Sequence, residues 1–361
     1  MNCLRLATTA LLLIIGLALG SCKKETEIQI KEKEVDKKYS WSEVAGLSGF
    51  ERVILSTGCN GQAIYLQQPN LFTQFINQNP VRGRRAAISP LSDVRVRLPI
   101  GAQIFAYPEE DSILTICRNN EPLNYRYYVQ LKRLDPTAIR FNTRLFSLST
   151  CMAINQNNYL LAPYDNNRPG RPFTFLLAAV TPGALGSGPI SVRTQQVVIP
   201  MNNSSGAYVR NLAAIDDYFL VNLGDAGIYK IKQDGTFRQV YPYALVDAFY
   251  KWQNTVYAPA EYNEILISAD NGDTWQKSTG TPMQFSLANY YPVRDSLVGV
   301  YFGSLYTLRW NGPRYTMRAL KNDGLERANI TGIQYLRDTV YVATTSGLFA
   351  RPVKEFFDTK L

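Results

Sequence analysis

The sequence predicts an all-β protein with the architecture of a β-propeller: seven blades, each a four-stranded antiparallel sheet, with six or eight blades as alternatives. Aromatic residues make up 12% of the 361 residues, including 23 tyrosines, and such a composition favours strands over helices. No long segment has a convincing helical period. A hairpin with strand-forming residues also recurs along the chain, which is the pattern of a repeat architecture.

The recurring unit is a turn-forming polar residue followed by a short apolar strand, as in "DYFLVN" from Asp217. Seven copies, 37 to 60 residues apart, begin at Glu51, Asp111, Asn158, Asp217, Asn254, Asp295 and Asp338. A second strand follows each copy, starting at residues 62, 125, 173, 227, 264, 304 and 347. One sheet cannot cover both of its apolar faces, whereas sheets stacked around an axis cover one another. A pair of β-sandwiches is the alternative, and it predicts less uniform spacing.

The first 21 residues are predicted to be an export signal. One early cation, Arg5, precedes an apolar run over residues 6–20, which is too short and too poorly flanked for a comfortable membrane span. Leu19-Gly20-Ser21-Cys22 resembles the lipobox of bacterial lipoproteins. The resemblance implies cleavage before Cys22, acylation of that residue and membrane lipid as a partner. The alternative is a secreted protein with a chance cysteine.

A charged tether is predicted for residues 22–48, with the propeller domain following over residues 49–361. Residues 23–38 alternate in charge sign and hold three aliphatic side chains, so they cannot bury enough apolar surface to fold alone. A short helix is the alternative. Lys23 stands where inner-membrane retention signals of some bacteria have aspartate. The resemblance therefore favours the outer membrane of a bacterial cell envelope, on its periplasmic or surface face.

Composition excludes several classes of function. The formal net charge is +9, yet the export signal and the lack of a recognition motif argue against nucleic acid as a partner. An anionic glycan fits the charge, and plain solubility is the alternative. Histidine is absent, which removes catalysis by Ser-His-Asp or Cys-His groups. Cys59, Cys117 and Cys151 allow one disulfide and form no C-x-x-C, so no metal site or cofactor is predicted.

One short stretch carries a resemblance to a known family. "SADNGDTW" fits S-x-D-x-G-x-T-W, which resembles the Asp box, or BNR repeat, of sialidase-type propellers. The glycine suits a positive φ, the aspartate can accept backbone N–H groups, and the tryptophan can pack between sheets. In the families that carry it, the box lies on the rim, so it implies a fold and not a ligand. The box residues are Ser268, Asp270, Gly272, Thr274 and Trp275.

A second resemblance lies near the C-terminus. "VYVATTSGLFARP", residues 340–352, resembles the blade core of photosystem-assembly-factor-like propellers, in which an inner strand reaches a Thr/Ser-Gly turn before an aromatic strand.

Two loops are candidates for binding. Residues 79–93 group Arg82, Arg84 and Arg85, and residues 163–173 group Tyr164, Arg168 and Arg171. Guanidinium groups suit carboxylates or phosphates, and tyrosine suits sugar faces or peptides. A solvated loop is the alternative for each. We therefore expect a non-catalytic binding or scaffolding module for an envelope protein or an anionic polysaccharide.

The alternative function is a glycan-active hydrolase of the sialidase type. Arg97-Leu98-Pro99 partly matches the R-I-P motif that carries one arginine of those enzymes. No catalytic residue is assigned, because a hydrolase needs an acid and a nucleophile that converge on one sugar. Two carboxylates and arginines in one axial pocket would favour the hydrolase. An uncharged or tyrosine-lined axial channel would favour binding.

Overall fold

The computed structural model describes residues 41–47, 49–76, 79–88, 97–121, 125–143, 152–183, 189–201, 208–260, 264–278, 289–311, 314–325 and 328–359. Only the backbone is described for residues 49, 50, 75, 76, 79–85, 310, 311, 314 and 315. The predicted signal peptide, Cys22 and most of the predicted tether lie outside these residues, as does Cys151. All described residues belong to one unit of the chain, Tyr39–Leu361.

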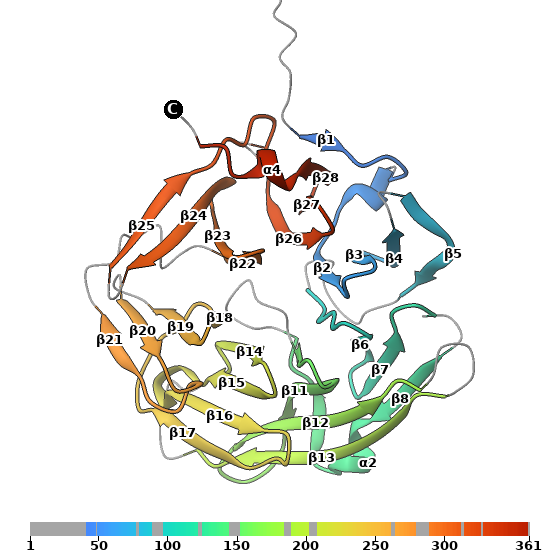
Figure 1. Cartoon of the computed structure of the whole chain (residues 1–361). Coiled ribbons are helices and arrows are strands. Elements are labelled where there is room, and N and C mark those ends of the chain that lie inside the picture. The colour runs from blue at the N-terminus through green and yellow to red at the C-terminus, as the bar shows by residue number, and fades with distance from the viewer. Residues whose placement is uncertain are drawn as a thin grey trace, which may run out of the picture. The chain divides into compact units, whose positions relative to one another are not determined.

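Seven antiparallel sheets surround a central axis as the blades of a seven-bladed β-propeller (Figure 1). From the axis outward, blade 1 holds β2 (Ser56–Cys59), β3 (Ile64–Gln68), β4 (Leu71–Ile76) and β5 (Asn79–Ala87). Blade 2 holds β6 (Ile104–Glu110), β7 (Ile113–Arg118) and β8 (Arg126–Gln130). Blade 3 holds β10 (Ala153–Ile154), β11 (Tyr159–Asn166), β12 (Phe173–Thr181) and β13 (Ser191–Ile199), with β9 (Ala138–Phe141) paired to β11 beside β10.

The remaining four blades have four strands each. Blade 4 holds β14 (Asn211–Ile215), β15 (Tyr218–Asn222), β16 (Ile228–Lys232) and β17 (Phe237–Tyr241). Blade 5 holds β18 (Tyr250–Trp252), β19 (Thr255–Ala260), β20 (Glu264–Ser268) and β21 (Gln276–Ser278). Blade 6 holds β22 (Asn289–Val293), β23 (Ser296–Tyr301), β24 (Ser304–Asn311) and β25 (Arg314–Ala319). Blade 7 holds β26 (Ile330–Leu336), β27 (Thr339–Thr344), β28 (Gly347–Pro352) and β1 (Ser42–Glu43).

Helices are short in the part of the chain that the structure describes. They are η1 (Gly49–Arg52), α2 (Leu131–Leu134), η2 (Gly224–Ala226) and α4 (Val353–Phe356). No described helix has both the length and the apolarity to span a membrane. The prediction of an all-β propeller with seven blades is confirmed.

The second strand of each blade is mostly apolar because both of its faces are covered by neighbouring blades. In β15, Phe219 and Val221 pack in the core shared with blade 3, whereas Tyr218 and Leu220 pack in the core shared with blade 5. Side chains alternate between the two faces of a strand, so burial on both faces requires a continuous apolar run. This explains why the recurring motif has no polar alternation.

In blade 1, the structure differs from the predicted position of the recurring strand. Residues 51–55, "ERVIL", do not form a strand: they end η1 and lead into β2. The strand equivalent to the other six copies is β3, so the interval from Gln62 to Asp111 is 49 residues and the spacing becomes more even. Ile54 is apolar because it is fully buried in the core between blades 7 and 1, where its N–H donates to the carbonyl of Thr344.

The ring closes by pairing the two ends of the domain. β1 is the outer strand of blade 7 and pairs with β28, with Ser42 opposite Ala350. The side chain of Trp41 is 5% exposed and meets the ring of Phe356 edge-on at a centroid distance of 5.9 Å. Blade 7 therefore includes β1, and Trp41, which precedes β1, packs against α4.

Glycine allows the inner strands to approach one another closely at the axis. A Cβ added at Gly58 would lie 2.9 Å from the Cβ of Ile100 and closer still to its Cγ2 atom. A Cβ added at Gly332 would lie 3.2 Å from the Cγ2 of Thr57 and closer to its hydroxyl. Neither glycine has a positive φ, so the requirement is space between neighbouring blades and not an unusual backbone conformation.

We expect Gly58→Ala to lower the free energy of unfolding by about 1–3 kcal/mol, because the new methyl group overpacks the contact with Ile100. Urea denaturation of the variant measures the loss. The matched control is the same substitution in an Ile100→Ala background, where the clash is relieved and the added cost should shrink. An equal cost in both backgrounds would contradict the steric explanation.

Candidate functional site

A cavity of about 380 Å³ lies among the innermost segments of the ring. Its volume is in the range of small-ligand pockets. Every blade supplies at least one residue to its wall, in the order Thr57, Ile100, Ile154, Asn211, Asp247, Tyr291 and Gln334 for blades 1 to 7. Arg97 joins them from the segment that leads into blade 2. We call this the axial cavity.

Arg97 brings a positive charge to the axial cavity that no described residue neutralises. Its half-buried side chain makes no hydrogen bond or ion pair with the residues that the structure describes. Burial raises the pKa of Tyr291, and the nearby charge of Arg97 opposes that rise. Asp247 differs, because Nη2 of the buried Arg210 donates to its Oδ1 at 2.8 Å. The described wall thus carries one cation without a counterion.

Polar and aromatic groups complete the wall. Thr331 is nine-tenths buried, and its hydroxyl has no hydrogen-bond partner among the described residues. Tyr290 stacks on Tyr250 with ring centroids 4.3 Å apart, and Gln334 Nε2 donates to the hydroxyl of Thr57 at 3.0 Å. An unpaired guanidinium beside an unsatisfied hydroxyl is an arrangement that can bind an anionic group.

Carboxylates are scarce in the axial cavity. Asp247 is the one acidic residue in its described wall, and it is already engaged by Arg210. Glycoside hydrolysis by the common mechanisms needs two carboxyl groups about 5–9.5 Å apart. Within the described ranges, no cluster of three His, Cys, Asp or Glu residues has the geometry of a metal site.

The segment Arg97-Leu98-Pro99 is fixed to blade 1 by a buried amide. The N–H of Leu98 donates to Gln67 Oε1 at 2.8 Å, and the hydroxyl of Ser56 donates to the same oxygen at 2.7 Å and to the Leu98 carbonyl at 3.0 Å. These bonds hold the segment against β2 and so place Arg97 in the axial cavity. The partial R-I-P motif includes Arg97, but no pattern in the sequence indicates that its charge is unpaired.

Sequence reasoning missed Asp247, Arg210 and Thr331. The only available signal was position: each lies on, or just before, the inner strand of a blade, a few residues ahead of a recurring hairpin. That signal becomes readable only after the blades have been assigned in the correct register.

The first predicted binding loop is mostly a strand. Arg82, Arg84 and Arg85 lie on β5, the outermost strand of blade 1, where Arg85 pairs with Thr73. Proline and charged residues are tolerated on an edge strand, which explains why this segment resembled a loop. The side chains of the three arginines and residues 89–93 lie outside the described part, so their binding role stays a prediction.

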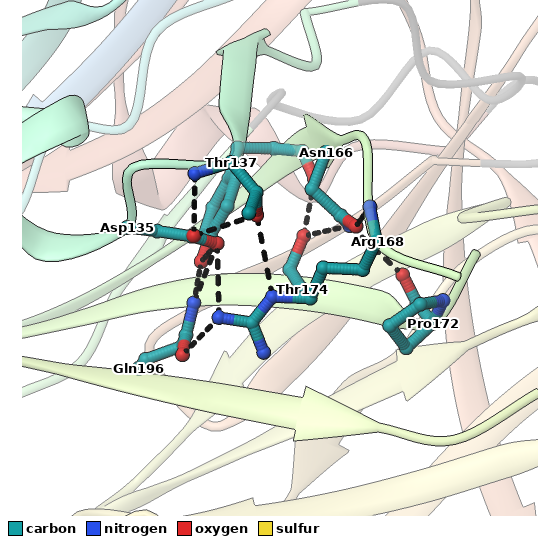
Figure 2. Close-up of polar contacts among 8 residues, drawn as sticks. Asp135, Thr137, Asn166, Arg168, Pro172, Thr174 and Gln196 are labelled. Atoms are coloured by element: carbon teal, nitrogen blue, oxygen red, sulfur yellow. Dashed lines mark hydrogen bonds and ion pairs between the residues drawn. The ribbon is translucent and has the colours of Figure 1, made fainter. Parts of the chain in front are cut away.

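Two residues of the second predicted loop belong to a buried polar network (Figure 2). Asp135, which is 1% exposed, accepts hydrogen bonds from the hydroxyl of Tyr164 at 2.9 Å and from Gln196 Nε2 at 2.7 Å. Arg168 Nη2 lies 3.2 Å from the same carboxylate, and Thr137 donates its N–H and hydroxyl at 3.0 and 2.7 Å. We call these five residues the Asp135 network.

The Asp135 network ties blade 2 to blade 3. Asp135 and Thr137 lie between α2 and β9, on the segment that leaves blade 2, whereas Tyr164 and Gln196 lie on β11 and β13. Tyr164 and Arg168 therefore have a structural role. Arg171 is exposed on the same loop with a φ of 43°, and its binding role stays a prediction.

The contacts within the Asp135 network shift the pKa values of Asp135 and Tyr164. Burial would raise the pKa of Asp135, but hydrogen bonds from Thr137 and Tyr164 and the charge of Arg168 outweigh burial and lower it. Burial raises the pKa of Tyr164 to about 12, with a further contribution from the Asp135 charge. The aspartate is therefore ionised and the phenol protonated at neutral pH.

The "SADNGDTW" turn connects β20 and β21, the last two strands of blade 5. Asp270 accepts the hydroxyl of Ser268 at 2.7 Å, the N–H of Thr274 at 2.9 Å and the hydroxyl of Thr274 at 2.6 Å. These bonds, those of Thr274 foremost, lower the pKa of Asp270. Gly272 has a φ of 80° and donates its N–H to Ser268 Oγ at 2.8 Å.

This turn also contacts the neighbouring blade. A Cβ on Gly272 would lie 3.3 Å from Leu220 of blade 4. Trp275 is partly buried in the core between blades 4 and 5, with its ring 6.4 Å from that of Phe249. None of the five motif residues belongs to the described wall of the axial cavity. The local contacts are those of a hairpin that helps to join two blades.

No protein-family model matches this chain, and no curated protein matches it. Its structure is similar to a chain in the crystal structure of BBS1N in complex with ARL6DN, with 14% identity and a TM-score of 0.50 over 89% of this chain and 99% of that chain. BamB from Moraxella catarrhalis is 10% identical over 85% of this chain and 87% of its own, with a TM-score of 0.48. PorZ, a surface component of the type-IX secretion system of Porphyromonas gingivalis, is 14% identical over 89% of this chain and 39% of its own, with a TM-score of 0.45. At these identities, the first similarity shows the fold alone.

We expect Asp135→Asn to lower the free energy of unfolding by about 1.5–3 kcal/mol near pH 7, because it removes hydrogen bonds to a buried charge. The folded-state pKa of Asp135 lies below its unfolded value, so its contribution is complete above a pH of about 4 and is lost as the pH falls through the folded pKa. Urea denaturation at several pH values should show the two proteins converging in acid.

The control for this variant is Arg140→Ala, which breaks an ion pair between β9 and Asp165 of β11, the strand that also carries Tyr164. Both side chains of that pair are largely exposed, at 57% and 40%, so its loss should cost less than about 1 kcal/mol. Equal losses in the two variants would show that burial does not strengthen the Asp135 network.

Proposed function

We propose that this protein is a lipid-anchored, cell-envelope β-propeller that acts as a non-catalytic binding or scaffolding module. Its partner is an envelope protein or an anionic polysaccharide. The observation that carries the proposal is the axial cavity, in which Arg97 is unpaired and Asp247 is neutralised by Arg210. Such a wall can attract an anionic group, but its described residues do not supply two free carboxylates for glycoside hydrolysis.

The anchor in this proposal rests on the sequence. Acylation at Cys22 would fix the chain to a bacterial outer membrane, and residues 23–40 would form the tether. Eighteen extended residues reach at most about 60 Å. The tether would join the propeller at Trp41, next to β1 on the outer edge of blade 7. We also propose that the turn over residues 268–275 is an Asp box, with a role in joining blades and none in binding a ligand.

The second candidate function is a glycan-active hydrolase of the sialidase type. It is favoured by the resemblance of residues 268–275 to an Asp box and by the position of Arg97 in the axial cavity. Turnover separates the two functions, because a binding module leaves its glycan intact.

We expect the purified full-length protein in detergent to bind envelope material without changing it. Fluorogenic sialosides and other glycosides should give no turnover above that of a heat-denatured sample. Photo-crosslinking in intact envelopes, followed by mass spectrometry, should identify one saturable protein or polysaccharide partner. Confirmed glycoside turnover, or failure to find any saturable partner, would contradict the proposed function.

We expect Cys22→Ala to abolish labelling by palmitate and to release the protein from the membrane fraction, because only a thiol at that position can carry the lipid thioether. Cys3→Ala is the matched control, since Cys3 lies within the predicted signal peptide. Labelling that persists in Cys22→Ala would rule out this anchor.

A further inference from the structure

The wall of the axial cavity carries both apolar and polar side chains. Blades 2, 3 and 5 contribute the apolar side chains of Ile100, Ile154 and Phe249. Blades 6 and 7 contribute the amide of Asn289 and the hydroxyl of Thr331, and neither group has a hydrogen-bond partner among the described residues. With Arg97, the wall combines one cation, two polar groups without partners among the described residues, and an aliphatic surface. A ligand that satisfies all three has a single negative charge, hydrogen-bonding groups and an apolar body.

We propose that the axial cavity binds the C-terminal residue of a protein chain, with Arg97 as the residue that binds the terminal carboxylate. This inference rests on the proposed binding function and names the chemistry of its ligand. The terminal carboxylate pairs with the guanidinium, the last peptide group bonds to Asn289 and Thr331, and an aliphatic last side chain packs on Ile100 and Ile154.

Charge favours a carboxylate over a phosphate. A monoanionic carboxylate matches the single uncompensated cation, and a guanidinium can bind it through two parallel hydrogen bonds. A phosphate monoester carries about −1.5 to −2 at neutral pH. The excess negative charge would face Asp247 in a partly desolvated space, where unpaired charge is costly.

The aliphatic side chains in the wall favour an amino-acid residue over an acidic sugar. The side chains of Ile100 and Ile154 are half-buried and offer no hydrogen-bonding group. A sugar ring placed there would leave hydroxyl groups without hydrogen-bond partners, which is unfavourable. An aliphatic side chain instead gains free energy from the same contact.

The test uses the purified full-length protein in detergent and a pair of fluorescent peptides that end in Gly-Ala-Leu, one with a free carboxylate and one with a C-terminal amide. The carboxylate peptide should bind saturably, and the amide should bind at least tenfold more weakly, because it lacks the charge that pairs with Arg97. This comparison needs no change in the protein, so it remains decisive if a variant fails to fold.

Variants then locate the site. Arg97→Gln should weaken binding of the carboxylate peptide at least tenfold, and Arg97→Lys should restore part of it. Arg318→Gln is the matched control, because Arg318 is exposed on β25, the outermost strand of blade 6, and its substitution should leave binding unchanged. Each variant is first checked for an unchanged melting temperature.

Four outcomes would overturn the inference: equal affinity for the acid and the amide, binding unaffected by Arg97→Gln, no peptide binding, or displacement of the peptide by glucuronate or inorganic phosphate at lower concentrations than by N-acetyl-leucine. The proposed function fails separately. If Arg97→Gln still captures its envelope partner in the crosslinking experiment, the module binds elsewhere, and only the assignment to the axial cavity is lost.

Discussion

The close approach of the inner strands at the axis is the constraint on which the rest of the ring depends. Seven sheets that spread at the rim must converge on a space of about 380 Å³, and at two neighbouring junctions glycine is the only residue that fits without movement: Gly332 against Thr57, and Gly58 against Ile100. Because the strands meet so closely, residues from all seven blades reach the same cavity. The steric condition that closes the ring therefore also assembles the candidate site.

The contact between blades 2 and 3, where the repeat is irregular, is stabilised differently from the contacts among the regular blades 4 to 7. Blades 4 to 7 repeat one design, in which an apolar second strand such as β15 buries alternate side chains in two cores. Blade 2 has three strands in the described residues, and the chain after β8 crosses to blade 3 through α2 and β9. There the Asp135 network adds directional bonds between the two blades. Polar contacts of this kind specify one register where apolar packing alone would permit others.

The local hydrophobic pattern of the sequence was sufficient to predict the strands of the blades, but it was not sufficient to predict the residues of the axial cavity. Strands such as β15, β19 and β27 were predictable because burial on both faces leaves a continuous apolar run in the sequence. β1 was not predictable in this way, because a strand of two residues is too short to show a hydrophobic period. It is stabilised by the packing of Trp41 on Phe356, which lies near the other end of the chain. The axial cavity was not predictable from the sequence, because each blade contributes few residues to it. No short segment of the sequence contains all the residues that line the cavity.

The position of a cationic side chain in the fold, and not the number of such side chains, determines how strongly it attracts an anion. The chain holds 38 lysine and arginine residues, and many described ones are paired at the surface, as Arg294 is with Asp338 at 48% and 88% exposure. Water screens such charges, so they contribute little specificity. Arg97 is half-buried without a counterion, where the effective dielectric is lower and an incoming anion is attracted more strongly. The folded chain begins at the outer edge of blade 7, beside β28. The pairing that closes the ring at its rim and the cavity at its axis therefore use different residues of one domain.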